Sequence, residues 1–296
     1  MKNKFKLDMP QIAHSFNSLD KISYQELVRK NQDTNKGDFG SIAIIGGGTG
    51  MYGALLLAGR AAMFMGAGKV TLGFAGDNSP VIDPLMPELM ITSINKILKV
   101  IDSYSVLIVG PGLGLDAMAL KVLIKIIKLQ PKCALIFDAD ALNLLAIHRD
   151  LHAKFNLLSN VVITPHPKEA SRLLDISVEV IQENRISAIS LLQKRFNACV
   201  LLKGHGSLIC DKETLFINAN GNCSLSNAGQ GDALSGMIAA FIAQGLNLLS
   251  ALQFAVYIQG CAADDLVSSY GGYNGILATD IIVNARKLLN KILYSS

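Results

Sequence analysis

The amino-acid sequence predicts an α/β protein with a mostly parallel central sheet and helices on both faces. Short apolar runs without polar alternation, at residues 42–45, 106–109 and 134–137, are typical of strands that are buried on both sides. Each run is followed by a longer segment with the apolar spacing of a helix. Glycine-rich or polar loops come directly after these strands, where open α/β sheets bind their ligands.

The expected elements alternate along the chain. The expected strands are residues 42–45, 69–74, 106–109, 134–137, 161–164 and 199–202, with a hairpin over 207–217. The expected helices are residues 24–29, 53–65, 118–129, 141–145, 168–174 and 178–196, and the C-terminal third is helical. The first 36 residues are otherwise polar and irregular. We therefore divide the chain into an N-terminal extension, residues 1–36, and a single domain, residues 37–296.

Composition excludes several classes of function. The chain of 296 residues is 50% hydrophobic and 17% charged, and its formal net charge of +4 comes without a cluster of lysine and arginine. Nucleic-acid binding normally needs such a basic face, so we expect none. The five cysteines form no C-x-x-C pair, which predicts reduced thiols, no cysteine-built metal site and a cytoplasmic protein.

Residues 233–263 contain no charged side chain and resemble a membrane span at first sight. Gln244, Gly245 and Asn247 divide them into two pieces, each shorter than the roughly 20 apolar residues that a spanning helix needs. We expect two buried helices and no membrane segment.

The loop after the first strand, G-G-G-T-G-M-Y-G, matches the dinucleotide pattern G-x-G-x-x-G at Gly48, Gly50 and Gly53. Asp77 follows at about the distance of a ribose-binding acid. This pattern favours a dehydrogenase, but any tight turn between a strand and a helix also selects glycine. No G-K-[ST] follows, which excludes a Walker-type phosphate loop.

Three later loops carry candidate ligand contacts. In G-P-G-L-G, Gly112 and Gly114 either form a simple turn or allow a ligand to approach the backbone. In T-P-H-P-K-E, two prolines stiffen the loop around His166, which favours a ligand contact over a surface role. K-G-H-G-S is either a hairpin turn or a cationic cradle for a nucleotide, formed by Lys203, Gly204, His205, Gly206 and Ser207.

The stretch S-N-A-G-Q-G-D-A-L-S-G places Asp232 at the start of a long apolar helix, after Gly229, Gln230 and Gly231. The first N–H groups of a helix lack partners and carry about half a positive charge, so they can bind an anion. Asp232 could cap the helix. It could instead accept a proton from a substrate hydroxyl as a phosphoryl group arrives.

Taken together, these loops make the sequence similar to the ADP/ATP-dependent NAD(P)H-hydrate dehydratases, which have the three-layer ribokinase-like fold. Seven stretches match in family order from about residue 36 to residue 245. They are K-G-D-F-G-S-I-A-I-I-G-G, the Y-G-A at the start of the first helix, G-P-G-L-G, D-A-D-A-L-N, T-P-H-P-K-E, L-L-K-G-H-G-S, and A-G-Q-G-D-A-L-S-G with A-Q-G further on.

The resemblance implies that the protein dehydrates the S epimer of hydrated NADH or NADPH at the expense of ADP, giving NAD(P)H, AMP and phosphate. It implies that Ala54, Gly114, His166 and Asp232 contact the hydrate, with Asp232 as the catalytic base. It further implies that the nucleotide is bound by Lys203, Gly204, His205, Gly206, Ser207 and Gly231, with Gly229 and Gln230 supporting the anion hole. It also implies Mg²⁺ with the nucleotide, ADP rather than ATP, and a homotetramer.

Two departures from the family pattern stand out. The family motif usually reads G-T-G-D, whereas this chain has Gln230 in place of threonine. If a threonine hydroxyl bonds phosphate in the family, turnover should fall here. Many relatives also carry an N-terminal epimerase domain, which about 36 residues cannot hold. The resemblance therefore implies a separate epimerase in the same pathway.

Three alternatives stay open at this point. A ribokinase-like kinase that phosphorylates a thiazole or pyridoxal type of alcohol would use the same G-x-G-D and fold. A dehydrogenase built on Gly48, Gly50 and Gly53 would transfer hydride without ADP. A nucleotide sensor that has lost turnover would bind ADP without releasing phosphate.

Overall fold

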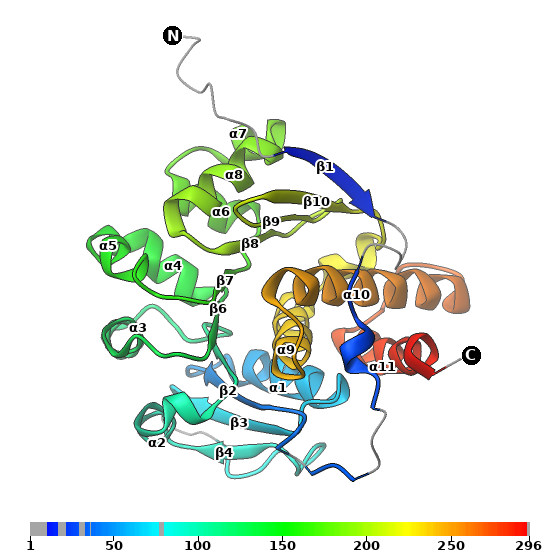
Figure 1. Ribbon diagram of the computed structural model, residues 1–296, viewed down its shortest axis with the longest axis horizontal. Coiled ribbons are helices and arrows are strands. Elements are labelled where there is room, and N and C mark those ends of the chain that lie inside the picture. The colour runs from blue at the N-terminus through cyan, green and yellow to red at the C-terminus, as the bar shows by residue number, and fades with distance from the viewer. Residues whose placement is uncertain (1–10, 17–21, 30–32, 36, 77–79, 295–296) are drawn as a thin grey trace.

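The computed structural model describes residues 11–16, 22–29, 33–35, 37–76 and 80–294. Within them lies a 10-stranded sheet with the strand order β1-β10-β9-β8-β7-β6-β5-β2-β3-β4 (Figure 1). The strands are β1 (Gln11–Phe16), β2 (Ser41–Gly46), β3 (Lys69–Phe74), β4 (Met90–Thr92), β5 (Val106–Val109), β6 (Ala134–Phe137), β7 (Val161–Ile163), β8 (Cys199–Leu202), β9 (Leu208–Cys210) and β10 (Thr214–Asn218). Neighbouring strands are parallel except where β9 pairs with β8 and β10.

Helices cover both faces of this sheet. They are α1 (Tyr52–Phe64), α2 (Ile94–Lys99), α3 (Ala117–Leu129), α4 (Asp140–Ile147), α5 (His152–Phe155), α6 (Pro167–Leu174), α7 (Val178–Glu183), α8 (Arg185–Phe196), α9 (Gln230–Ala243), α10 (Leu248–Tyr270) and α11 (Ala278–Tyr294). The described residues also form short 3-10 turns between these elements, among them η2 (Gln25–Leu27) and η5 (Cys223–Ser226).

Two hydrophobic cores lie on opposite faces of the sheet because successive strand residues point in opposite directions. Ile44 of β2 belongs to the core formed with α1, α9, α10 and α11, whereas its neighbour Ile45 belongs to the core formed with α2 to α8. Both side chains are fully buried. The strands therefore read as unbroken apolar runs, and the predicted three-layer α/β fold is confirmed.

Most expected elements occur at the expected positions, but β4, α2 and α5 were not expected, and three further segments differ from the expectation. Residues 178–196 form two helices rather than one, because Asn184 has non-helical backbone angles and its side chain accepts a hydrogen bond from Ser187 N at the start of α8. The expected helix over residues 24–29 is only the turn η2. Residues 11–16, expected to be irregular, form strand β1, which pairs with β10 at the edge of the sheet.

The strongly apolar stretch 233–263 is divided as expected. Helix α9 ends at Ala243 and α10 begins at Leu248, and both helices lie over the same face of the sheet (Figure 1). Among the described residues, none of the helices has the length and apolarity that a membrane span requires.

Candidate functional site

Backbone hydrogen bonds join the loops at the carboxyl ends of the parallel strands into one continuous edge. Gly48 N, after β2, donates to Gly112 O, after β5, with a separation of 2.5 Å. At the other end of this row, Lys203 N, after β8, donates to Pro165 O, after β7, at 2.9 Å. The convergence of these loops, expected from the sequence, is therefore confirmed, and the candidate site lies along this edge.

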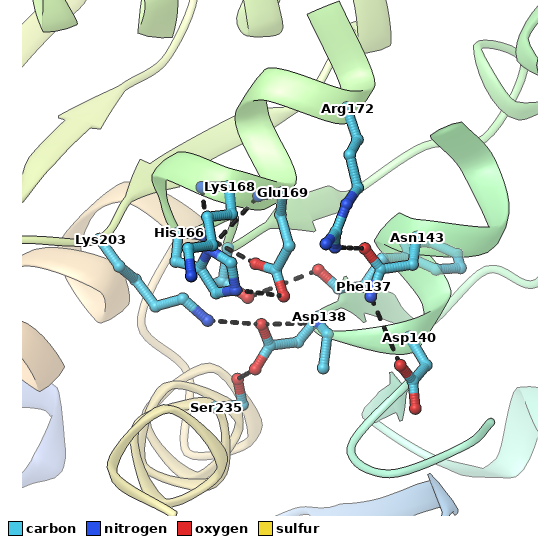
Figure 2. Close-up of polar contacts among 12 residues, drawn as sticks. Phe137, Asp138, Asp140, Asn143, His166, Lys168, Glu169, Arg172, Lys203 and Ser235 are labelled. Carbon is cyan, nitrogen blue, oxygen red and sulfur yellow. Dashed lines mark hydrogen bonds and ion pairs between the residues drawn. The ribbon is translucent and has the colours of Figure 1, made fainter. Parts of the chain in front are cut away.

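Asp138 lies at the centre of the edge, directly after β6. Its Oδ1 is 2.7 Å from Lys203 Nζ, and its Oδ2 accepts a hydrogen bond of 2.7 Å from Ser235 Oγ on α9 (Figure 2). Asp138 is only 1% exposed. Burial opposes ionisation of its carboxyl, but Lys203 and the hydrogen bonds from Ser235 and Thr164 together outweigh burial and lower the pKa of Asp138. The carboxylate of Asp138 in turn raises the pKa of Lys203 against the effect of burial. The two side chains thus form a charged pair that fixes α9 over the strand ends.

Asp232 stands in the first turn of α9 and does not cap the helix. The N-cap is Gly229, which has a φ of +83° that favours glycine, and no side chain caps this end. Among the described residues, the Asp232 carboxylate has no hydrogen-bond or ion-pair partner. Burial and the nearby Asp138 raise the pKa of Asp232 to about 6, with Lys203 acting in the opposite direction. A carboxylate that is desolvated and unpaired can accept a proton near neutral pH.

A cavity of about 270 Å³ opens beside the start of α9. It is lined by the whole predicted nucleotide set, Lys203, Gly204, His205, Gly206, Ser207 and Gly231, and also by Gln230. A Cβ added at Gly231 would lie 3.3 Å from Lys203 Nζ, so the backbone here closely approaches the ammonium group. An anionic group in this cavity would meet the positive end of α9 and the Lys203 side chain together.

The predicted hydrate contacts Ala54 and Gly114 lie further along the same edge, outside this cavity. The loop 110–114 packs on the start of α1, where a Cβ at Gly112 would come within 3.3 Å of Ala54 Cβ. Gly114 N donates to Asp140 Oδ2 at 2.9 Å. Asp140 itself contributes to the raised pKa of Asp232, which places the Gly114 loop within electrostatic reach of that carboxylate.

A chain of side chains supports Asp140 from behind. Arg172 on α6 donates to Asn143 Oδ1 at 2.7 Å, and Asn143 Nδ2 lies 3.4 Å from Asp140 Oδ1 (Figure 2). These contacts link α6 and α4 to the loop that contains Gly114.

His166 is the N-cap of α6 and forms a capping box with Glu169. Its Nδ1 accepts hydrogen bonds from Lys168 N at 3.0 Å and Glu169 N at 3.3 Å, while Glu169 Oε2 accepts from His166 N at 2.8 Å. Burial and the nearby Lys203 lower the pKa of His166 to about 4. The neutral ring therefore carries its proton on Nε2, because Nδ1 acts as an acceptor. His166 has a structural role that the sequence analysis did not assign, and its Nε2 lies 3.3 Å from Glu169 Oε1 within the same capping box.

Several residues at the site escaped sequence analysis as individual contributors. Asp138 and Ser235 lay inside recognised motifs, but nothing in the sequence paired them across 97 positions. Arg185 lay inside an expected helix with no motif around it. Its guanidinium donates to the carbonyls of Leu202, Lys203 and His205, and so holds the loop that lines the cavity.

The dehydrogenase pattern loses its structural basis. In a dinucleotide fold the third glycine allows the helix to pack closely on the strand. A Cβ at Gly53 would meet no atom within 4 Å, and the same holds for Gly50. Asp77, the candidate ribose acid, lies outside the described residues.

The sheet order, the two helical layers and the glycine-capped start of α9 at the carboxyl edge define a ribokinase-like α/β protein. A solved structure from Enterococcus faecalis V583, described as a ribokinase-like superfamily protein, superposes with a TM-score of 0.81 at 27% identity. That superposition covers 94% of this chain and 96% of the other.

Sequence comparison narrows the class to one family. The family described as NAD(P)H-hydrate dehydratase matches residues 42–286. The chain is 37% identical to the ADP-dependent (S)-NAD(P)H-hydrate dehydratase of Neisseria meningitidis serogroup B, over 89% of this chain and 90% of that protein. It is also 37% identical to the bifunctional NAD(P)H-hydrate repair enzyme Nnr of Coxiella burnetii, over 89% of this chain but 53% of that longer protein. The chain belongs to the NAD(P)H-hydrate dehydratase family.

Proposed function

We propose that the protein is an ADP-dependent (S)-NAD(P)H-hydrate dehydratase, a carbon–oxygen lyase that converts hydrated NADH or NADPH back to the reduced cofactor. The observation that supports this most is the position of Asp232. Its unpaired carboxylate follows Gly231 of the nucleotide cavity directly and lies within electrostatic reach of Asp140, the partner of Gly114. One carboxylate thus stands between the nucleotide set and the hydrate set, where a phosphoryl group would pass between them.

The reaction proceeds in two chemical stages. In the first stage Asp232 accepts the proton of the substrate hydroxyl while the oxygen of that hydroxyl forms a bond to the β-phosphorus of ADP. The bond between the β-phosphorus and AMP breaks at the same time. Phosphate then leaves with the former hydroxyl oxygen, so the carbon–oxygen bond breaks. Loss of a proton from the adjacent carbon restores the ring double bond. The products are NAD(P)H, AMP and phosphate.

The surrounding residues position these groups. The N–H groups of Gly229, Gln230 and Gly231 at the start of α9, with Lys203, stabilise negative charge on the transferred phosphoryl group. The half-exposed ring of His166 contacts the hydrate, and the loop 110–114, packed on Ala54 through Gly112, orients it beside Asp232. The loop from Lys203 to Ser207 holds the nucleotide.

Mg²⁺ is the metal that this chemistry calls for, and the donor groups at the edge fit it. Mg²⁺ is bound by phosphate oxygens, water and one or two carboxylates. Asp140 would supply a carboxylate oxygen, and its charge reaches the neighbouring Asp232, whose pKa it helps to raise. When bound with the nucleotide, Mg²⁺ would neutralise charge on the phosphates.

The experiment that tests this function follows the absorbance of reduced nicotinamide in a mixture of purified protein, NADH hydrate and Mg²⁺. Absorbance should rise with ADP, rise less or not at all without nucleotide, and rise at least about 100-fold more slowly with the Asp232→Asn variant. ATP in place of ADP tests the nucleotide preference, and NADPH hydrate tests the preference for the cofactor. No rise with any nucleotide would contradict the proposal.

Three further features of the proposal come from the family alone. We expect a separate epimerase that interconverts the R and S hydrates, a homotetrameric assembly and a cytoplasmic location. Native mass spectrometry of the purified protein tests the assembly directly.

A further inference from the structure

One wall of the nucleotide cavity contains residues with buried side-chain atoms that have no hydrogen-bond partner among the described residues. The cavity, about 270 Å³, is slightly smaller than the roughly 300–1,000 Å³ typical of small-molecule sites. It therefore suits a mononucleotide better than a dinucleotide. One side is formed by the loop Lys203–Ser207, and the other by residues after β10, the start of α9 and part of α10.

Gln230 is the most unusual member of this wall. Gln230 lines the cavity and is 4% exposed, yet both polar atoms of its buried carboxamide, Nε2 and Oε1, lack a hydrogen-bond partner. Its backbone is held from behind, because Gln259 Nε2 donates to Gln230 O at 2.8 Å. Burying a carboxamide without partners is unfavourable, so a group that enters the cavity is expected to supply them.

Two asparagines extend the same wall with free acceptors. Asn218 Nδ2 donates to Asn220 O at 2.8 Å, and Asn220 Nδ2 lies 3.4 Å from Cys261 Sγ. These contacts orient both amides and leave Asn218 Oδ1 and Asn220 Oδ1 buried and without partners. Both residues line the cavity. The wall therefore presents three acceptors and, at Gln230 Nε2, one donor.

This pattern does not suit a phosphate. A phosphate oxygen would accept from Gln230 Nε2 but would repel Oε1 and the two asparagine oxygens, all of which are acceptors. An uncharged edge that both donates and accepts would satisfy the carboxamide of Gln230 completely. The amino edge of adenine has this character, and a glutamine carboxamide pairs with it through two hydrogen bonds. The ribose hydroxyl groups can donate and accept in the same way.

We propose that Gln230, together with Asn218 and Asn220, determines specificity for the uncharged nucleoside end of the co-substrate, while the backbone of the α9 start holds its phosphates. This inference rests on the proposed function, because it takes the cavity to be the site of an adenine nucleotide. It gives the side chain of Gln230 a role that its backbone N–H group does not fulfil.

The test measures the binding of nucleotides by titration calorimetry and needs no hydrate. The ligands are ADP, inosine diphosphate, which has an oxygen in place of the amino group, and 2′-deoxy-ADP, which lacks one ribose hydroxyl. Pyrophosphate serves as the ligand that has no nucleoside. The wild-type protein should bind ADP more tightly than at least one of the two altered nucleotides, by roughly tenfold for a lost pair of hydrogen bonds.

Gln230→Met removes both polar atoms at similar volume, and Gln253→Met is its matched control. Gln253 is a buried glutamine on α10, 3% exposed, whose Nε2 also lacks a partner, but it does not line the cavity. Gln230→Met should weaken ADP binding about tenfold, leave pyrophosphate binding unchanged and leave the melting temperature unchanged or higher. Gln253→Met should bind all ligands as the wild-type protein does.

Two parts of the nucleotide, the adenine edge and the ribose, could supply these hydrogen bonds. The affinity of Gln230→Met for ADP, relative to each altered nucleotide, distinguishes them. If Gln230→Met removes the preference for ADP over inosine diphosphate, the carboxamide contacts the adenine edge. If it removes the preference for ADP over 2′-deoxy-ADP, the contact is to the ribose. ADP binding within twofold of wild type in Gln230→Met, or an equal loss of pyrophosphate binding, would overturn the proposal.

The wild-type protein alone gives two further tests, which hold even if Gln230→Met does not fold or the hydrate is not dehydrated. A wild-type protein that binds ADP, inosine diphosphate and 2′-deoxy-ADP equally, or binds none of them, overturns the proposal without any variant. A protein that binds ADP with this selectivity but does not dehydrate the hydrate contradicts the proposed function and supports the specificity of the wall.

Discussion

Lys203 Nζ lies 2.7 Å from Asp138 Oδ1, so a buried ion pair links the end of β8 to the end of β6 across the intervening β7. Ser235 Oγ donates to the other carboxylate oxygen at 2.7 Å and extends the link to α9. The nucleotide loop, the central strands and the helix that carries Asp232 are thereby fixed relative to one another (Figure 2). We expect the proposed catalytic geometry to depend on this pair, although Asp138 makes no proposed contact with the substrate.

Breaking this pair on one side should destabilise the protein strongly. Lys203→Met leaves the Asp138 carboxylate buried without its partner, at a cost of about 3–5 kcal/mol in the free energy of unfolding. The double variant Lys203→Met/Asp138→Leu should recover part of that loss. Urea denaturation of both variants measures the effect, and a single variant as stable as the wild type would contradict it.

The same pair predicts a loss of stability in acid. The folded-state pKa of Asp138 lies below its ordinary value of 3.8, so its contribution is fully present above pH 3.8. The contribution is lost as the pH falls through the folded-state pKa. Comparing the acid denaturation of the wild-type protein with that of Lys203→Met/Asp138→Leu isolates this part, and identical acid profiles would count against it.

Asp232 should give the opposite pH dependence of stability, and its protonation should change stability and activity over the same pH range. Its pKa is raised to about 6 in the folded protein, from an ordinary value of 3.8. The folded state therefore binds the proton more tightly, and the free energy of unfolding should rise as the pH falls from above 6 to 3.8, by at most about 3 kcal/mol. Over the same range kcat should fall, because a protonated carboxyl cannot act as a base.

The matched variant for this prediction is Asp232→Asn. It should be more stable than the wild-type protein at neutral pH, because it removes the cost of the desolvated charge, and its stability should lose the step near pH 6. Its turnover should fall by roughly 10²- to 10⁴-fold, as for removal of a general base. Thermal melts at several pH values would contradict the assignment if Asp232→Asn proved less stable than wild type at pH 7.

His166 can be tested by a substitution that separates its two roles. Asparagine is a preferred N-cap, so His166→Asn should keep the start of α6 and the melting temperature, whereas His166→Ala should lose about 1 kcal/mol of stability. Both variants remove the half-exposed imidazole ring and should raise KM for the hydrate without changing KM for ADP. An unchanged KM for the hydrate in His166→Asn would restrict His166 to the capping role.

Arg185 should affect nucleotide binding without touching the nucleotide. Arg185→Lys keeps the charge, but one ammonium group cannot span the carbonyls of Leu202, Lys203 and His205. We expect KM for ADP to rise about tenfold while kcat changes little. Arg195→Lys, on the same helix but bonded to Leu173 O, is the control and should leave KM unchanged. Equal effects of the two variants would indicate only a general disturbance of α8.

The sequence predicted the fold and the loops of the site well because each strand was a short apolar run that ended in glycine or a polar residue. Strands β3, β5, β6 and β8 begin and end at the expected residues. Strand β4 was missed because its three residues are too short for a pattern, and β1 because it lies in a polar stretch and pairs with β10, about 200 residues away.

What the sequence could not reveal is pairing across the sheet. Nothing in the motif around Lys203 indicates Asp138 as its partner, and nothing near Arg185 indicates a helix that holds the nucleotide loop. The capping role of His166 could have been found, because a glutamate three residues later is the mark of a capping box. The unsatisfied carboxamide of Gln230 became visible only when the cavity was placed beside it.

Phosphoryl transfer from ADP drives dehydration in the proposed reaction, and the balance of its products tests this most directly. Wild-type protein is incubated with NADH hydrate, ADP and Mg²⁺, and AMP, inorganic phosphate and NADH are quantified in the same sample. We expect the three products in equal amounts, and their formation roughly 10²- to 10⁴-fold slower with Asp232→Asn. Consumption of nucleotide with a stable phosphorylated product, and without free phosphate or NADH, would contradict it and indicate a kinase.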